Sequence, residues 1–102
     1  MDVSPTIEAN VRSTFSEHGA RTALALLTSM LEPPQTPEWA VARERVQIAA
    51  LMLARGNLDS LKAAVKQSQV DWRDTLTAAG LSNANWPSVA SAAGFAVPLG
   101  GA

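Results

Sequence analysis

The feature that most constrains this fold is an unbroken apolar stretch at residues 48–54, where no side chain is polar. It lies in a longer helical pattern at residues 37–55, opened by Thr36 and Pro37 and followed by Gly56 as a helix stop. The first half of this helix is amphipathic, whereas the second half is apolar on every side. Such a helix is normally surrounded by other elements. The sequence therefore predicts that residues 37–55 form the centre of the fold.

Shorter helices are predicted on the N-terminal side of this segment. Ser4 and Pro5 form an N-cap followed by a proline in the first helical turn, which predicts a helix over residues 5–18. Gly19 follows as the expected left-handed residue at the helix end. A second helix is predicted over residues 20–31, because two consecutive prolines stop the pattern just beyond it.

On the C-terminal side, a tight reversal is predicted at Gly56 and Asn57, followed by a helix over residues 58–68. A connection this short joins helices that pack against each other in opposite directions. We therefore expect residues 58–68 to lie antiparallel to the central helix.

The last part of the chain contains an internal repeat, because residues 71–81 align with residues 85–95 at a spacing of fourteen positions. Each segment reads Asp or Asn, then Trp, and later Ala-Ala-Gly and a large apolar residue. This pattern predicts two short helices of about two turns, each with a capping side chain at its start and a left-handed glycine at its end. The whole chain is thus expected to be all-α, an irregular bundle of five to six helices. We expect one domain over residues 1–95 and a frayed tail over residues 96–102.

Composition narrows the possible functions. The formal net charge of −1 weighs against a general nucleic-acid binder, which normally carries a basic excess. The absence of cysteine removes disulfides, thiolate metal ligands and a cysteine nucleophile. The first residues lack the basic and apolar regions of a signal peptide, and the apolar run at 48–54 is too short to span a bilayer. We therefore expect a soluble, cytoplasmic protein that does not insert into membranes.

No catalytic, cofactor-binding or metal site is predicted from the residue pattern. His18 is the single histidine, and it is predicted to lie near a helix C-terminus. A positively charged side chain interacts favourably with the helix dipole there, so we expect a structural role for His18. Asp71 and Asp74 fit the start of a helix, and no acidic cluster has the spacing of metal ligands. The chain contains no phosphate-binding glycine loop and no serine-nucleophile turn.

Residues 43–80 carry a recognisable order of motifs. It comprises Arg-Glu-Arg-Val at 43–46, the apolar run, Gly-Asn-Leu-Asp at 56–59, Asp-Trp-Arg-Asp at 71–74 and Ala-Ala-Gly at 78–80. This segment resembles a class of small, uncharacterised bacterial helical proteins with no assigned function. The resemblance implies a helical domain of bacterial origin and implies no activity.

Arg73 and Asp74 match the pattern of that class, and Trp72 matches it as an aromatic residue. An ion pair from Arg73 that fixes the helix at 71–81 to the central helix would account for this match without a functional role.

Three functions remain. We favour a non-enzymatic protein–protein interaction module, which forms a homodimer or binds another protein. The candidate partner contacts are Trp39, Trp72, Trp86 and Arg73, because Trp and Arg are enriched where interfaces gain most of their affinity. The structural alternative is that each Trp side chain fixes its own helix to the bundle.

The second function is a nucleic-acid-associated regulator with a degenerate helix-turn-helix at residues 71–94. Pro87 lies in the first turn of its would-be recognition helix, which carries no Arg, Lys or Gln to read base edges. The third function is an enzyme with a site assembled from dispersed polar residues, such as Arg43, Glu44, Asp71, Arg73 and Asp74.

Overall fold

The computed structural model describes residues 4–29 and 37–97, and the side chains of these residues except those of 37–42. Within these ranges the regular secondary structure consists of five helices and contains no strand. They are α1 (Pro5–Thr14), α2 (Glu17–Ser29), α3 (Pro37–Ala54), α4 (Leu58–Ala79) and α5 (Trp86–Ala92). The predicted all-α fold class is confirmed.

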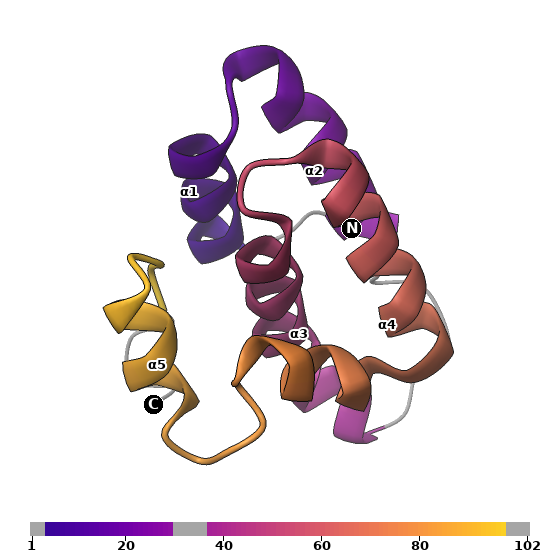
Figure 1. Ribbon diagram of the computed structural model, residues 1–102, viewed down its shortest axis with the longest axis vertical. Coiled ribbons are helices and arrows are strands. Elements are labelled where there is room, and N and C mark those ends of the chain that lie inside the picture. Colours follow the sequence, from indigo (N-terminus) through magenta and orange to yellow (C-terminus); the bar gives the residue numbers. More distant parts are fainter. Residues whose placement is uncertain (1–3, 30–36, 98–102) are drawn as a thin grey trace.

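Helix α3 lies between the other helices (Figure 1) and packs against α1, α4 and α5. It also reaches α2, because the Gln47 side-chain amide donates a 3.0 Å hydrogen bond to the backbone carbonyl of Leu27. The first half of α4 runs back along α3 in the opposite direction (Figure 1). The reversal between them uses positive φ angles at Arg55 and Gly56, and the Asn57 side chain then caps α4 by accepting a hydrogen bond from Ser60 N–H.

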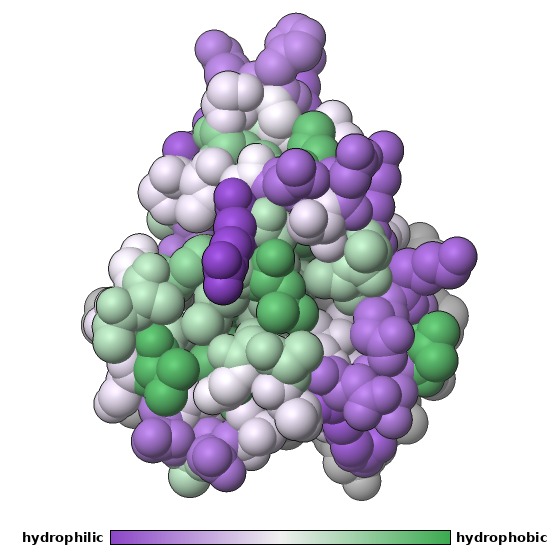
Figure 2. Space-filling model, viewed as in Figure 1, coloured by the Kyte–Doolittle hydropathy of each residue, from purple (hydrophilic) through white to green (hydrophobic). Residues whose placement is uncertain are grey.

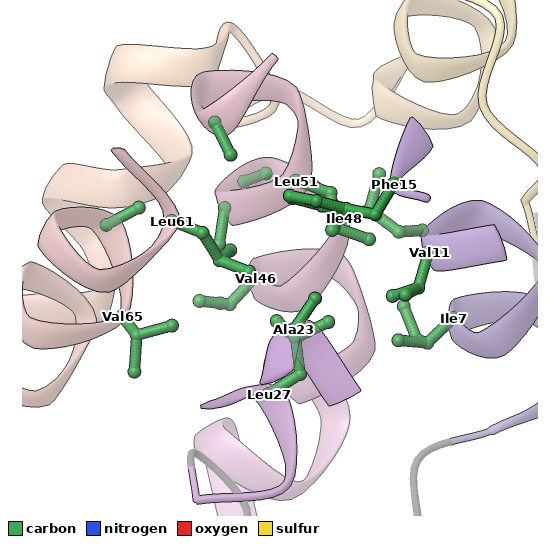
Figure 3. Packing of buried hydrophobic residues seen from close by; sticks show 14 of the residues in the cluster. Ile7, Val11, Phe15, Ala23, Leu27, Val46, Ile48, Leu51, Leu61 and Val65 are labelled. Atoms are coloured by element: carbon green, nitrogen blue, oxygen red, sulfur yellow. The ribbon is translucent and has the colours of Figure 1, made fainter. Parts of the chain in front are cut away.

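The apolar core is centred on α3. Figure 3 shows Val46, Ile48 and Leu51 of this helix among side chains from α1, α2 and α4. These three residues are fully buried, and each contributes about 1.5–3 kcal/mol through removal of its side chain from water. The apolar stretch at residues 48–54 therefore has other helices packed against several of its sides, as its sequence pattern predicts.

The junction of α1 and α2 differs from the prediction of a helix over residues 5–18. Helix α1 ends at Thr14, and Phe15 takes an extended conformation with φ −121° and ψ 150°. This turn of the backbone directs Phe15 into the core, where it is 8% exposed. Helix α1 therefore ends four residues before the predicted end at residue 18, and Phe15 is buried at the junction.

Helix α2 starts earlier than predicted because Ser16 supplies its cap. The Ser16 hydroxyl accepts a 3.4 Å hydrogen bond from Gly19 N–H, and its carbonyl accepts one from Ala20 N–H. Gly19 is consequently inside the first turns of α2, and its predicted role as a left-handed helix end is wrong. His18 lies at the N-terminus of α2, so its predicted place at a helix C-terminus is also wrong.

The two helices predicted at residues 58–68 and from residue 71 onward are joined as α4, with a kink at Asp71. This residue has non-helical angles, φ −156° and ψ 101°, and its carboxylate accepts a 3.0 Å hydrogen bond from Arg73 N–H. The two halves are linked across the kink by the hydroxyl groups of Ser68 and Thr75, which are buried and 2.8 Å apart. A polar contact of this kind lets the backbone bend without leaving a buried hydroxyl unpaired.

The ends of α4 and α5 have the same hydrogen-bonded geometry. Gly80 has a φ of 79°, and the next residue, Leu81, donates from its N–H to the Leu76 carbonyl at 2.9 Å. Gly94 has a φ of 92°, and Phe95 makes the equivalent bond to Ala90 at 3.0 Å. Both are glycine-terminated helix ends in which the chain folds back onto the last turn.

The start of α5 does not match the predicted cap. The side chain of Asn85 makes no capping hydrogen bond, and its backbone angles of φ −84° and ψ 14° lie outside the extended region that a capping residue uses. Asn85 therefore occupies the predicted N-cap position, but the predicted capping by its side chain is wrong. Only backbone groups of Asn85 close the first turn, where its carbonyl accepts a 3.0 Å hydrogen bond from Ser88 N–H.

Candidate functional site

Arg45 of α3 holds the turn between α4 and α5. Its Nε donates a 2.7 Å hydrogen bond to the carbonyl of Leu81, and its Nη2 donates a 3.1 Å bond to the carbonyl of Asn83. Its Cζ lies over the Trp86 ring, 5.7 Å from the centroid. Partial burial lowers the pKa of Arg45 below its ordinary value. One side chain therefore fixes both the path of the turn and the position of an aromatic ring.

Sequence reasoning did not identify Arg45. Its carbonyl partners lie 36 and 38 residues further along the chain, and carbonyl groups have no sequence signature. The sequence shows only that Arg45 lies in the amphipathic half of the predicted central helix.

The C-terminal apolar surface consists of half-buried side chains of α5 and the residues that follow it. Its members pack against the core on one side and are partly open to solvent on the other: Trp86, Val89, Phe95 and Val97. Figure 2 shows green, hydrophobic side chains over α5, continuing toward α3, while purple hydrophilic side chains predominate along α4. Arg45 lies over the aromatic ring at one end of this surface.

Asn10 of α1 holds the far end of the same segment. Its side-chain amide donates a 3.0 Å hydrogen bond to the carbonyl of Ala96 and accepts a 2.7 Å bond from the N–H of that residue. Asn10 is buried, and it pairs both backbone groups of Ala96. The tail predicted to fray begins at Ala96, so its first residue is bonded and Val97 packs against the core. Residues 98–102 lie outside the described residues.

Trp72 and Arg73 form a second aromatic–cation pair at the kink of α4. The Arg73 Cζ is 4.6 Å from the centroid of the Trp72 ring. Arg73 is exposed and forms no ion pair among the described side chains, so the predicted ion pair with the central helix is not found there. Val70, just before the kink, is 77% exposed.

The predicted partner contacts are thus placed separately. Trp86 contacts Arg45, and Trp72 contacts Arg73. Trp39 belongs to α3, but its side chain is outside the described part of the chain. Both described Trp side chains are half-buried and pack against the core. Their packing against the core fits the structural alternative, and a role of either ring as a partner contact stays a prediction.

Three of the residues considered for an enzymatic site, Glu44, Asp71 and Asp74, make hydrogen bonds within the chain. Glu44 accepts a hydrogen bond from the hydroxyl of Ser4, the cap of α1. Asp71 accepts from the backbone at the kink, and Asp74 is 3.4 Å from the side-chain nitrogen of Gln67. Within the described ranges, no group of three or more His, Cys, Asp or Glu side chains is placed to hold a metal ion.

The arrangement of α4, turn and α5 corresponds to the segment considered for nucleic-acid recognition. The exposed positions of α5 include Ser88, Ser91 and Ala92, and the helix carries no cationic side chain. Arg and Lys supply the commonest specific base contact and most of the salt-dependent affinity for phosphates, and α5 contributes neither residue type. Among the helices described, none is long and apolar enough to cross a membrane.

Comparisons of this chain with protein-family models, with curated proteins and with solved structures find no match. The resemblance of residues 43–80 to small bacterial helical proteins stays an expectation. The contacts of the described residues are what bears on function.

Proposed function

We propose that this chain is a non-enzymatic protein–protein interaction module that associates with a second copy of itself through the C-terminal apolar surface. The observation that carries this proposal is the grouping of partly exposed Trp86, Val89, Phe95 and Val97 on one short segment. Interface cores are enriched in aromatic and apolar side chains and poor in charge. The exposed parts of these four residues have that composition.

The position of the Trp86 ring supports the proposal. Arg45 lies over the ring and is itself fixed by two backbone carbonyls, so the aromatic side chain is already ordered in the isolated chain. A side chain that is ordered before binding loses less conformational entropy when a partner covers it. Tryptophan and arginine are also the residues whose truncation most often weakens interfaces.

Charge and symmetry favour a second copy as the partner. The net charge of −1 produces little repulsion between two identical chains. A two-fold interface uses the same surface on both copies, so a single apolar surface that contains its own aromatic residues can serve both sides.

The proposal treats residues 71–81 and 85–95 as related units. It is supported by the matching helix ends, in which Leu81 bonds back to Leu76 and Phe95 bonds back to Ala90. Leu81 is fully buried, whereas Phe95 is half-buried. In this view the first unit contributes its apolar residue to the core, and the second leaves part of its apolar residue for the interface.

A matched pair of valine substitutions tests the proposed surface. Val89→Asp places a charge on the C-terminal apolar surface, whereas Val70→Asp places the same charge on a 77% exposed valine outside it. We expect Val89→Asp to abolish self-association, measured by sedimentation velocity, and Val70→Asp to leave it unchanged. Ala92→Arg, at an exposed position of α5, adds a charged side chain without removing buried apolar surface, and we expect it to weaken association as well.

Circular dichroism spectra that match the wild type are required for each variant. Wild-type association in both Val89→Asp and Ala92→Arg would refute the proposed surface. Loss of association in Val70→Asp alone would place the interface at the kink of α4.

A further inference from the structure

Helix α5 has little stability of its own. It contains seven residues, of which only Ala90 is buried. Helices shorter than about 12–15 residues are marginal in water without tertiary support. The start of α5 lacks a capping side chain at Asn85, in contrast to Ser4 before α1 and Asn57 before α4. The helix must therefore be held in place by the rest of the molecule.

The segment that contains α5 is anchored near both ends by polar side chains of the body. At its start, Arg45 of α3 donates to the carbonyls of Leu81 and Asn83. At its end, Asn10 of α1 pairs both backbone groups of Ala96. Between these anchors, α5 lies beside α3 at the edge of the bundle (Figure 1).

The burial of large apolar side chains decreases after Leu81. Among the described residues, the large apolar side chains that are fully buried include Ile7, Leu27, Leu51 and Leu61, and Leu81 is the last of them along the chain. Beyond it the larger apolar side chains are half-buried. Segments with few buried apolar contacts open at a lower free energy than the core.

We propose that residues 82–97 form a strap that opens and closes as one cooperative unit while α1–α4 stay folded. Arg45 and Asn10 are the two anchors that hold the strap closed. Opening uncovers the parts of α3 and α1 on which α5 and Ala96 lie. This inference concerns the single chain and does not depend on self-association.

Native-state hydrogen exchange of the full chain tests the strap. The Phe95 and Ala96 amides, bonded to Ala90 and Asn10, report on the strap. The Leu51 and Leu61 amides report on the body. In the wild type we expect the strap amides to share one opening free energy, with exchange at least 10-fold faster than for the body. Measurement at two protein concentrations separates any protection that arises from self-association. Equal protection of strap and body amides would overturn the proposal.

Two substitutions distinguish independent opening from global unfolding. Arg45→Ala removes the bond to Asn83 and the contact with Trp86, which are lost when the strap opens, so we expect exchange of the strap amides to rise about 10-fold. Gln47→Leu removes a hydrogen bond to Leu27 that persists in the open state. It should accelerate the Leu51 and Leu61 amides and leave the strap amides unchanged.

Two further substitutions test the second anchor and provide a control. Asn10→Ala should accelerate the Phe95 amide about 10-fold, and this amide is the reporter because Asn10 is not its acceptor. Arg12→Ala, which breaks an exposed ion pair with Glu8, should leave the strap amides unchanged. The proposal would be overturned if Gln47→Leu accelerated strap and body amides equally, or if neither anchor substitution changed exchange in the strap.

Discussion

The Nε of Arg45 donates a 2.7 Å hydrogen bond to the carbonyl of Leu81, which lies 36 residues further along the chain. The bond connects the central helix to Leu81, the last large apolar residue along the described chain that is fully buried. Leu81 follows the left-handed Gly80, so its carbonyl lies beyond the end of the helical hydrogen-bond ladder. Arg45 therefore supplies a donor for a backbone group that the helix end leaves without a helical partner.

Arg45→Ala should lower the free energy of unfolding by about 2 kcal/mol, because two hydrogen bonds from a charged donor and the contact with Trp86 are lost. Arg45→Lys should recover about half of that loss, since an ammonium group keeps the charge but not the fork of donors. Urea denaturation measures both values. A loss below about 0.5 kcal/mol for Arg45→Ala would mean that the contact contributes little.

Substitution by alanine should destabilise the protein by different amounts at three glycine positions. Gly80→Ala and Gly94→Ala should each destabilise by about 1 kcal/mol, because both have positive φ but open space around an added Cβ. Gly56→Ala should cost more, since the new Cβ would also lie 3.0 Å from the carbonyl oxygen of Thr14. Thermal unfolding of the three variants checks this order. Neutral effects at both Gly80 and Gly94 would contradict the left-handed helix ends.

Gly19→Ala should have the opposite sign. Gly19 lies inside α2, and an added Cβ would make ordinary contacts of 3.5 Å or more with Phe15 and Ser16. Alanine is the better helix former by about 0.5–1 kcal/mol, so the variant should be more stable than the wild type. Destabilisation would instead support a left-handed helix end at Gly19, and the comparison of melting temperatures decides between them.

The hydroxyl pair at the kink of α4 should show energetic coupling. Ser68 and Thr75 are buried, and their hydroxyl oxygens are 2.8 Å apart. In a double-mutant cycle of Ser68→Ala and Thr75→Val, we expect a coupling energy of about 1 kcal/mol. Chemical denaturation of the four proteins gives this value. A coupling near zero would show that each hydroxyl is satisfied independently, for example through the existing bond from Ser68 to the Ala64 carbonyl.

Local signals in the sequence were sufficient for much of the fold. The cap at Ser4, the reversal at Gly56 and the glycine ends at Gly80 and Gly94 each depend on residues within a few positions. The apolar stretch at residues 48–54 also indicated burial directly, because no face of that helix could be left in water. These elements required no knowledge of distant contacts.

The errors arose where local signals competed or where partners lie far along the chain. Ser16 and Gly19 lie three positions apart, and the Ser16 hydroxyl accepts from Gly19 N–H, so Ser16 starts a helix where Gly19 was predicted to end one. Arg45 and Asn10 were not identified because their partners are backbone groups 36 and 86 residues away. The paired Trp and Arg at residues 72 and 73 were recognised as candidates, but the sequence could not show that the guanidinium lies over the ring.

The measurement that tests the proposed function most directly is the solution mass of the wild-type chain by light scattering over a wide concentration range, with tryptophan fluorescence recorded on the same samples. We predict a mass that approaches twice that of one chain as concentration rises, accompanied by a blue shift of the emission as the exposed part of Trp86 is covered. A mass of one chain at every concentration, with unchanged emission, would contradict self-association through the C-terminal apolar surface.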